Sequence, residues 1–371
     1  MRATSESLEE LTMGPRRIGL WAEGFRPLFM SPDSQRLFTV SWPSWPSSGA
    51  SKLKVHSLLT EKVPEVIEDR EHTIEDAAIL ARSFASPTKL VSSGCGQSMA
   101  VLLSGGLVKL VDLTTYEPVD GDFMRVGEGA CQLACSADGN RMAIGYSGLP
   151  RNPQIAVFDT TTRKKVQELD GARTWSGCGR VFFSPDGSHV IAIDSGNWLA
   201  VWNREGKLVK EDNTDDYHET RQGTGVAVTP DSTKLLYLHN TAAGGGPFLG
   251  YLVRMHDLTS NKTVREWQFP GALRALDVSP DGRRILVAGG HLKVPEYEGI
   301  CEWSLDAPDG AVGDHCSFSI IATLRDEDLT FARFAPDGSK IVAASFEVTP
   351  ERSVTGNKFI TVYDYPKHFV L

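Results

Sequence analysis

One short turn signal recurs along this chain and constrains its fold more than any other feature. Six copies read Ser/Thr/Ala-Pro/Ala-Asp-Gly/Ser, each followed by an apolar run, with the aspartate at positions 33, 138, 186, 231, 281 and 337. A seventh, degenerate copy, "SSGCGQSMAVLLSGG", aligns with "CSADGNRMAIGYSG" if Cys95 takes the aspartate position. Successive anchors lie 62, 43, 48, 45, 50 and 56 residues apart. This spacing indicates a structural unit of roughly 40–50 residues that is repeated along the whole chain.

The chemistry of the motif predicts a tight hairpin turn. Proline at the second position holds φ at about −65°, aspartate tolerates the bridge region, and glycine accepts the left-handed conformation that follows. Such a sequence is typical of a type I turn with a glycine bulge between two strands. Ser34 and Ser232 stand where the other copies have glycine, so we expect backbone strain in these two turns.

A second recurring signal lies downstream of each turn. After an apolar strand and a loop comes another strand with a similar ending: "LKVHS" (53–57), "VKLVD" (108–112), "IAVFD" (155–159), "LAVWN" (199–203), "LVRMHD" (252–257), "ICEWS" (300–304) and "ITVYD" (360–364). A more polar fourth strand follows, as in "KKVQELDG". We therefore predict an all-β, seven-bladed β-propeller of four-stranded antiparallel blades that forms a single domain over residues 1–371.

Four strands per unit and seven units resemble the WD-repeat propeller family over nearly the whole chain. The sequence contains no Trp-Asp dipeptide, and no Gly-His lies between a fourth strand and the next first strand. The chain thus lacks the residues from which the family builds its hydrogen-bonded network. The resemblance implies a rigid scaffold that presents a surface to peptides or other proteins without catalysis of its own.

Two segments modify the simple repeat. The last copy has only three strands, and "RRIGLWAEG" (16–24) before the first anchor resembles the missing fourth strand. Pairing this segment with the last blade would close the ring and remove an open sheet edge. The segment "HTIEDAAILARSF" (72–84) has Thr73 as a helix N-cap and Pro87 as a stop, so we predict a short inserted helix over residues 73–84.

The connections between second and third strands differ strongly in length. Two are tight, "SGG" and "SGN", whereas five are long: 42–51, 147–153, 240–250, 289–299 and 346–357. We call the side of the molecule that should carry these five connections the loop face. Loops on a rigid scaffold are common binding sites, and aromatic residues are enriched at recognition hot spots. The aromatic candidates for partner binding are Trp42, Trp45, Tyr146, Phe248, Tyr297 and Phe346. The alternative is that these aromatic side chains pack as lids over the blades.

Polar residues near the ends of second strands suggest a different use of the same face. Candidates for a ligand or metal at the mouth of a central channel are Asp194, His239, Asn240, His291 and Glu347. Capping of loops is the simpler interpretation, and we predict no metal. Arg26, Arg180 and Arg274 lie four or five residues before their turns, at the entrance of the innermost strands. They could line an anion-accepting channel, but neutralisation of nearby carboxylates or bonding to loop carbonyls explains them more simply.

Composition excludes several classes of function. Lys plus Arg number 38 against 47 Asp plus Glu, for a net charge of −9, which argues against general nucleic-acid binding. No apolar run approaches the roughly 18 residues of a membrane span, and the N-terminus lacks the apolar region of a secretory signal. Six cysteines without a dense pattern favour reduced thiols in a cytoplasmic protein. We expect Cys131 and Cys135, four residues apart, to point to one side of their strand and to pack between blades.

Catalytic motifs are weak. "GQSMA" (96–100) loosely resembles a nucleophile elbow, but it falls on a predicted hairpin rather than a strand-to-helix turn. No phosphate-binding glycine loop and no two-histidine zinc helix occur, so we predict no cofactor. Binding of a protein or peptide is the favoured function. The alternative is a propeller enzyme or lectin-like protein, in the manner of lactonases, isomerases or lyases, with its site at the channel mouth.

Overall fold

The computed structural model describes residues 16–21, 24–30, 34–42, 52–57, 98–112, 122–146, 155–169, 178–194, 198–213, 225–240, 251–269, 273–289, 299–311, 318–323, 327–348 and 354–365. Over these residues the secondary structure is β-strand, apart from one 3-10 turn, η2 (Ser104–Gly106). The helix expected over residues 73–84 lies outside them.

The strands form antiparallel sheets in which chain neighbours are sheet neighbours. The two sheets nearest the N-terminus have three described strands each: β2 (Gly24–Met30), β3 (Arg36–Trp42) and β4 (Lys52–Ser57), then β5 (Ser98–Leu103), β6 (Leu107–Asp112) and β7 (Met124–Arg125). Two four-stranded sheets follow: β8 (Ala130–Cys135), β9 (Arg141–Tyr146), β10 (Ile155–Asp159) and β11 (Lys164–Leu169), then β12 (Cys178–Phe183), β13 (His189–Asp194), β14 (Trp198–Asn203) and β15 (Leu208–Asn213).

The C-terminal half continues the same pattern with additions at the outer edges. One sheet contains β16 (Val226–Val228), β17 (Lys234–Asn240), β18 (Tyr251–Asp257), β19 (Lys262–Phe269) and, added in parallel, β23 (Gly310–Ala311). The next contains β20 (Ala275–Val278), β21 (Arg284–Gly289), β22 (Gly299–Ser304) and β24 (Phe318–Thr323). The last contains β25 (Glu327–Phe334), β26 (Lys340–Val348), β27 (Val354–Asp364) and β1 (Arg16–Trp21).

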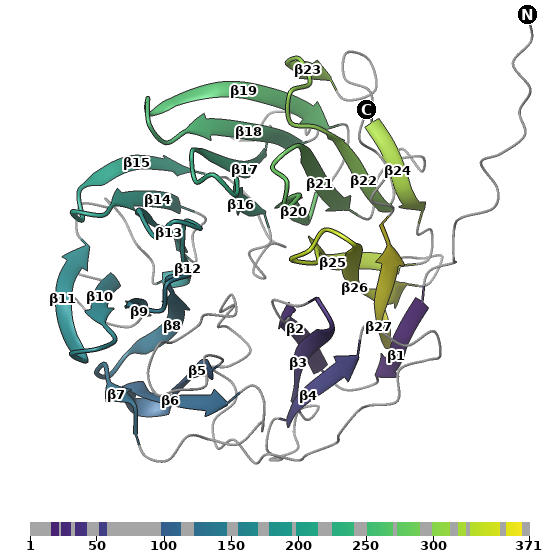
Figure 1. Ribbon diagram of the computed structural model, residues 1–371. Helices are drawn as coiled ribbons and strands as arrows, with labels where there is room; N and C mark the ends of the chain where they lie inside the picture. The colour runs from purple at the N-terminus through teal and green to yellow at the C-terminus, as the bar shows by residue number, and fades with distance from the viewer. Residues whose placement is uncertain are drawn as a thin grey trace, which may run out of the picture.

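Figure 1 shows these sheets set radially around a common centre, with first strands such as β8, β12, β20 and β25 near the centre and β11, β19 and β1 at the rim. All seven predicted third-strand segments lie in third strands, namely β4, β6, β10, β14, β18, β22 and β27. The architecture is therefore propeller-like, as the repeat predicts.

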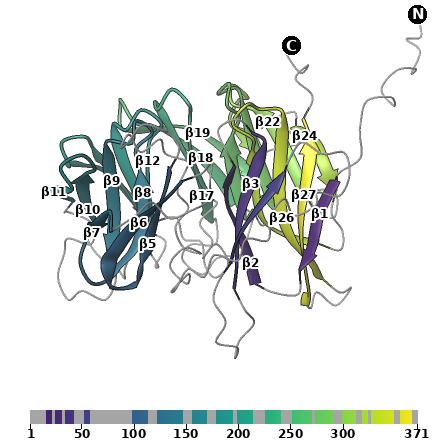
Figure 2. The same cartoon turned by 60° about the horizontal axis from the view of Figure 1, so that its bottom comes forward.

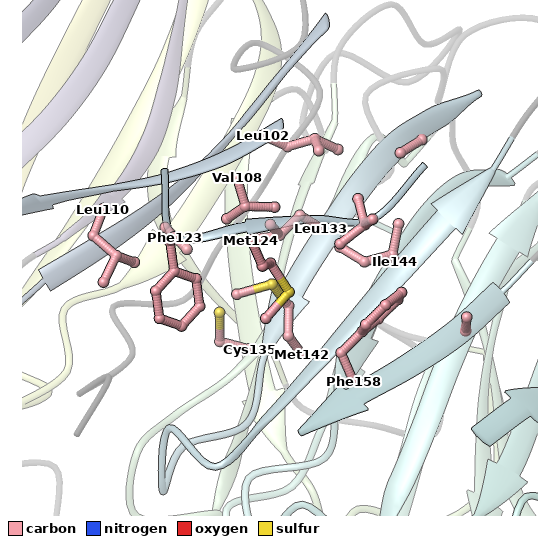
Figure 3. Close-up of a cluster of buried hydrophobic side chains, with 14 of the residues drawn as sticks. Leu102, Val108, Leu110, Phe123, Met124, Leu133, Cys135, Met142, Ile144 and Phe158 are labelled. Carbon is pink, nitrogen blue, oxygen red and sulfur yellow. The ribbon is translucent and has the colours of Figure 1, made fainter. Parts of the chain in front are cut away.

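Burial explains why the inner strands read as continuous apolar runs. Five of the six residues of β9 are buried, whereas most residues of β11 at the rim are exposed. A strand between two neighbouring sheets is covered on both faces, so both sets of side chains are apolar. Clusters of buried side chains fill the space between consecutive sheets. Figure 3 shows one of them, in which Leu102 and Val108 pack against Leu133, Met142 and Phe158 of the next sheet. A further cluster joins Met30 and Leu37 to the β25–β27 sheet.

The strand β1 gives the last sheet its fourth strand. It pairs antiparallel with β27, for example Leu20 with Phe359. The expected pairing of the N-terminal segment with the third strand of the last unit is thus observed over residues 16–21, although the expected segment extends to residue 24. The two ends of the described chain are held in one sheet.

The short turns after the first strands contact one another from sheet to sheet. We call the side that they occupy the turn face (136–139, 184–187, 229–232, 279–282 and 335–338); Figure 2 shows the strands running between the two faces. The Asp186 N–H donates to Ser232 Oγ at 3.0 Å, and the Asp337 N–H donates to Ser34 Oγ at 2.9 Å. Both serines have positive φ, 61° and 57°. The expected strain is therefore present at each serine, and each hydroxyl accepts a hydrogen bond from the preceding turn.

Glycines occupy the matching position in turns without these serines, and three of them lie close to the turn of the preceding sheet. A Cβ at Gly282 would lie 3.5 Å from Pro230, and one at Gly338 would lie 3.8 Å from Pro280. A Cβ at Gly187 would lie 3.6 Å from the Cβ of Ser136. The turns at Gly187, Gly282 and Gly338 therefore lie against the turn of the sheet before them.

The cysteine expectation is wrong in one respect. Cys135 belongs to the cluster between the β5–β7 and β8–β11 sheets, whereas Cys131 packs against the cluster on the opposite side. The reason is a register shift between Ala130 and Gln132, which makes Cys131 the extra residue of a β-bulge and reverses its direction. Both cysteines pack between sheets, as expected, and neither forms a disulfide.

Candidate functional site

The long connections leave the molecule on the side opposite the turn face. They follow the second strands β3, β9, β17 and β21, and comprise residues 43–51, 147–154, 241–250 and 290–298. After β5 and β13 the corresponding connections are only 104–106 and 195–197. Because successive antiparallel strands reverse direction, all of these connections depart from the loop face.

In the last sheet the loop-face connection is partly a strand extension. The strands β26 and β27 have 9 and 11 residues, compared with 6 for β13 and β14. Val348 still pairs with Val354, so only residues 349–353 lie between the two strands. Phe346 and Glu347 lie on this extension, opposite Asp328 and Glu327 of β25. The prediction of a loop over residues 346–357 is therefore wrong at both ends, since residues 346–348 belong to β26 and residues 354–357 to β27.

The structure describes two of the six aromatic candidates with their side chains. Tyr146 is 8% exposed, belongs to the buried cluster of Figure 3, and donates its hydroxyl to the Val126 carbonyl at 2.7 Å. Burial raises the pKa of this tyrosine to about 12. Tyr146 therefore packs between sheets. For this residue the observation favours the alternative in which the aromatic side chain packs against the blades. Phe346 is half-buried on the extension. The strand position of Trp42 at the end of β3 is described but its side chain is not, and Trp45, Phe248 and Tyr297 lie outside the described residues.

Four of the five channel-mouth candidates lie at or near the predicted strand ends. Asp194 is the last residue of β13 and 3% exposed, and its Oδ1 accepts the Trp198 N–H at 2.8 Å. This carboxylate therefore holds the short 195–197 connection, as the capping interpretation predicts. His239 lies near the end of β17 and Glu347 near the end of β26, both half-buried. Asn240 ends β17, and His291 lies outside the described residues. Among described residues no group of three or more His, Cys, Asp or Glu is arranged to hold a metal ion.

The three arginine candidates lie on or beside innermost strands. Arg180 of β12 is buried, with 7% of its surface exposed, and Arg274 directly precedes β20, where its N–H donates to the Ala288 carbonyl at 2.8 Å. Arg26 lies in β2, with its side chain outside the described set.

Two further charged residues on innermost strands escaped the sequence reasoning. The carboxylate of Asp277 in β20 crosses to the next sheet and accepts the N–H of Phe334 in β25 at 2.9 Å. Burial raises the pKa of Asp277, and the neighbouring Arg333 opposes that rise. The Arg333 guanidinium carbon lies 6.0 Å from the centre of the Phe331 ring. The sequence signal that could have revealed Asp277 is a charged residue inside an otherwise apolar strand, as in "ALDVSP".

A buried carboxylate makes a polar contact between the last two sheets. Glu302 in β22 is 3% exposed, and its two carboxylate oxygens accept from Arg284 Nη1 at 2.6 Å and from the Tyr365 hydroxyl at 2.5 Å. Tyr365 directly follows β27, so this contact joins the last two sheets. Burial and the Glu302 acceptor raise the pKa of Tyr365.

The turn aspartates form a regular set on the turn face. Asp186 accepts the Ser188 N–H at 2.9 Å and the Ser184 hydroxyl at 2.7 Å. Burial alone would raise the pKa of this carboxyl, but these hydrogen bonds and those of the Ser188 and Ser232 hydroxyls lower it to about 2. Equivalent bonds lower the pKa of Asp138, Asp231, Asp281 and Asp337. These hydrogen bonds give the aspartates a structural role in their own turns.

The geometry defines the class of an all-β, propeller-like protein with one elaborated face. No protein-family model and no curated protein sequence matches the chain. Among solved structures, the hydrazine synthase of Kuenenia stuttgartiensis matches at a TM-score of 0.47 and 17% identity, over 68% of this chain and 74% of that one. Among described residues, no helix is long and apolar enough to cross a membrane.

Proposed function

We propose that this chain is a divergent WD-repeat-type propeller of seven blades and that it acts inside the cell as a non-catalytic scaffold, which binds a protein or peptide on its loop face. The observation that carries the proposal is the contrast between the two faces. On the turn face, the connections are short and contact their neighbours, whereas on the loop face most connections are long. A scaffold that must hold its shape while offering a variable surface needs this division.

Closure of the ring by β1 is part of the proposal. The pairing of β1 with β27 and the cluster that joins Met30 and Leu37 to the last sheet both support it. Deletion of residues 1–24 should expose the edge of β27 and lower the melting temperature sharply. A truncated protein that melts like the full-length chain would show that β1 does not close the ring.

Binding is tested by comparing the two faces. Trp45→Ala and Tyr297→Ala change loop-face residues, and Glu205→Ala changes an exposed residue of the turn between β14 and β15. Quantitative affinity capture with each purified variant should show loss of the same partner for both loop-face variants and retention for Glu205→Ala. All three should melt like the wild-type protein. Equal capture by all variants would refute the assignment of the loop face.

The alternative of a ligand or active site at the channel mouth predicts other results. Elemental analysis would find a metal in the purified protein, or substitution of His239 and Glu347 would abolish binding of a small molecule. Either result, with intact capture by Trp45→Ala, would replace the scaffold proposal.

A further inference from the structure

The outer contact between β15 and the β16–β19 sheet contains an unusual number of charged groups. We call this set the β15–β18 contact; it consists of Lys210, Asp212, Tyr237, Arg254 and His256. The Asp212 carboxylate accepts the Tyr237 hydroxyl at 2.6 Å and Lys210 Nζ at 3.2 Å, and Arg254 Nη1 lies 3.9 Å from it. Lys210 Nζ also lies 5.3 Å from the centre of the Tyr237 ring. These bonds join one sheet to the next near the rim (Figure 1).

His256 is the member of the contact that can change its charge near neutral pH. It lies in β18 and is 3% exposed. Its Nε2 lies 3.0 Å from Asn261 Oδ1, which is an acceptor, so Nε2 carries the proton and donates. Its Nδ1 is buried and has no hydrogen-bond partner among the described residues. A second proton would therefore have to enter at an atom with neither an acceptor nor contact with water.

The charged groups around the imidazole have opposing effects. Lys210 on β15 repels a proton on His256, while Asp212 on β15 and Asp257 on β18 attract one. Lys234 on β17 neutralises Asp257 through an ion pair at 2.5 Å. Asp212 accepts from two donors, Tyr237 and Lys210, and forms a longer ion pair with Arg254. Burial, followed by the effect of Lys210, lowers the pKa of His256, and the two carboxylates and Asn261 do not compensate.

We propose that His256 makes the β15–β18 contact sensitive to protons, so that acidification loosens this contact while the contacts between other sheets persist. The sign follows from linkage. A histidine whose folded-state pKa is lowered stabilises the folded contact fully above the ordinary value of about 6.5, and this stability is lost as the pH falls below it. Each pH unit below about 6.5 favours the open, protonated form by up to tenfold.

Hydrogen exchange of the full chain at pH 7.5 and 5.5, corrected for intrinsic rates, tests the proposal. Peptides that cover β15 and β18 should lose protection by up to tenfold between these values in the wild-type protein. The His256→Gln variant keeps an amide donor for Asn261 but cannot be protonated, so its protection should remain unchanged. Peptides that cover β22 and the end of β27 report the Glu302 contact, which has no histidine, and should not respond.

A matched variant controls for loss of a histidine elsewhere. His189→Gln removes a half-buried imidazole whose Nδ1 lies 2.8 Å from Ser188 Oγ, in the same sheet as β15. It should leave the response of the β15–β18 contact intact. Lys210→Met, which removes the repelling charge, should give a smaller response than wild type, and this variant decides the question if His256→Gln does not fold. An equal response in wild type, His256→Gln and Lys210→Met, or no response in wild type, would overturn the proposal.

Discussion

The hydrogen bond between neighbouring turns at Ser232 can be tested by two substitutions with different expected results. Ser232 is 5% exposed, has a φ of 61°, and accepts the Asp186 N–H from the neighbouring sheet at 3.0 Å. Ser232→Ala removes the hydroxyl but keeps the Cβ and therefore the cost of the positive φ. Ser232→Gly removes both the hydrogen bond and the strain.

The two contributions are of similar size. A net intramolecular hydrogen bond contributes about 1 kcal/mol, and a residue other than glycine in the left-handed region costs about 1 kcal/mol. Ser232→Ala should therefore lower the free energy of unfolding by about 1 kcal/mol. Ser232→Gly should be close to neutral, since relief of the strain offsets the lost hydrogen bond. The alanine variant should also raise the pKa of Asp186 above its present value of about 2, because the serine hydroxyl helps to lower it.

Urea unfolding followed by intrinsic tryptophan fluorescence, to which the buried Trp202, Trp267 and Trp303 contribute, measures both changes. We expect a lower midpoint with an unchanged slope for the alanine variant. Ser34 has the same geometry against Asp337, so the Ser34 pair of variants serves as an independent repeat. If the alanine variant were as stable as wild type while the glycine variant was destabilised, the hydroxyl would have no stabilising role and the reasoning would fail.

Three further predictions address other parts of the fold. Gly106→Ala should lower the free energy of unfolding by more than about 3 kcal/mol, because the added Cβ would lie 1.8 Å from a backbone oxygen. Gly105→Ala has a similar φ but open space around the added Cβ, so it should lower the free energy of unfolding by about 1 kcal/mol. Equal midpoints in urea for the two variants would contradict this. Tyr237→Phe should lower the free energy of unfolding by about 1.5–3 kcal/mol, because it removes the hydroxyl that donates to the Asp212 carboxylate at 2.6 Å. An unchanged midpoint in urea would argue against that hydrogen bond. The folded-state pKa of Asp186, about 2, is below the ordinary value, so its stabilisation is present above about pH 4 and is lost as the pH falls toward 2. Melting temperatures of wild type and Asp186→Asn at pH 5 and pH 2.5 should therefore converge at the lower pH.

Elements set by local chemistry were predictable from the sequence. The Pro-Asp-Gly signal fixes a turn through the conformations that its own residues allow, and the third strands follow because "IAVFD" or "LAVWN" can be buried on both faces. The pairing of β1 with β27 could be predicted because the last repeat contains only three strands and the N-terminal segment resembles the missing fourth.

Elements that depend on distant partners were not predictable. The strand β23 has two residues, too few for any period, and it pairs with β19 because the chain after β22 reaches the neighbouring sheet. There the Ala307 carbonyl accepts Trp267 Nε1 at 3.3 Å and Asp309 accepts the Glu266 N–H at 3.2 Å. Likewise, Glu302 reads as an interruption of an apolar strand until Tyr365, 63 residues later, provides its donor.

The candidate site is the part least accessible to sequence reasoning, for a physical reason. A residue on the turn face must satisfy its own turn and its neighbour's, so its type is restricted, as the two serines at positive φ illustrate. On the loop face, Asp194 accepts the Trp198 N–H across the ends of the short 195–197 connection, and no motif recurs in the sequences of the five long connections. These five connections differ in length and composition. The repeat that identifies the fold is thus silent about a partner, because the residues that would choose the partner are those that the repeat does not constrain.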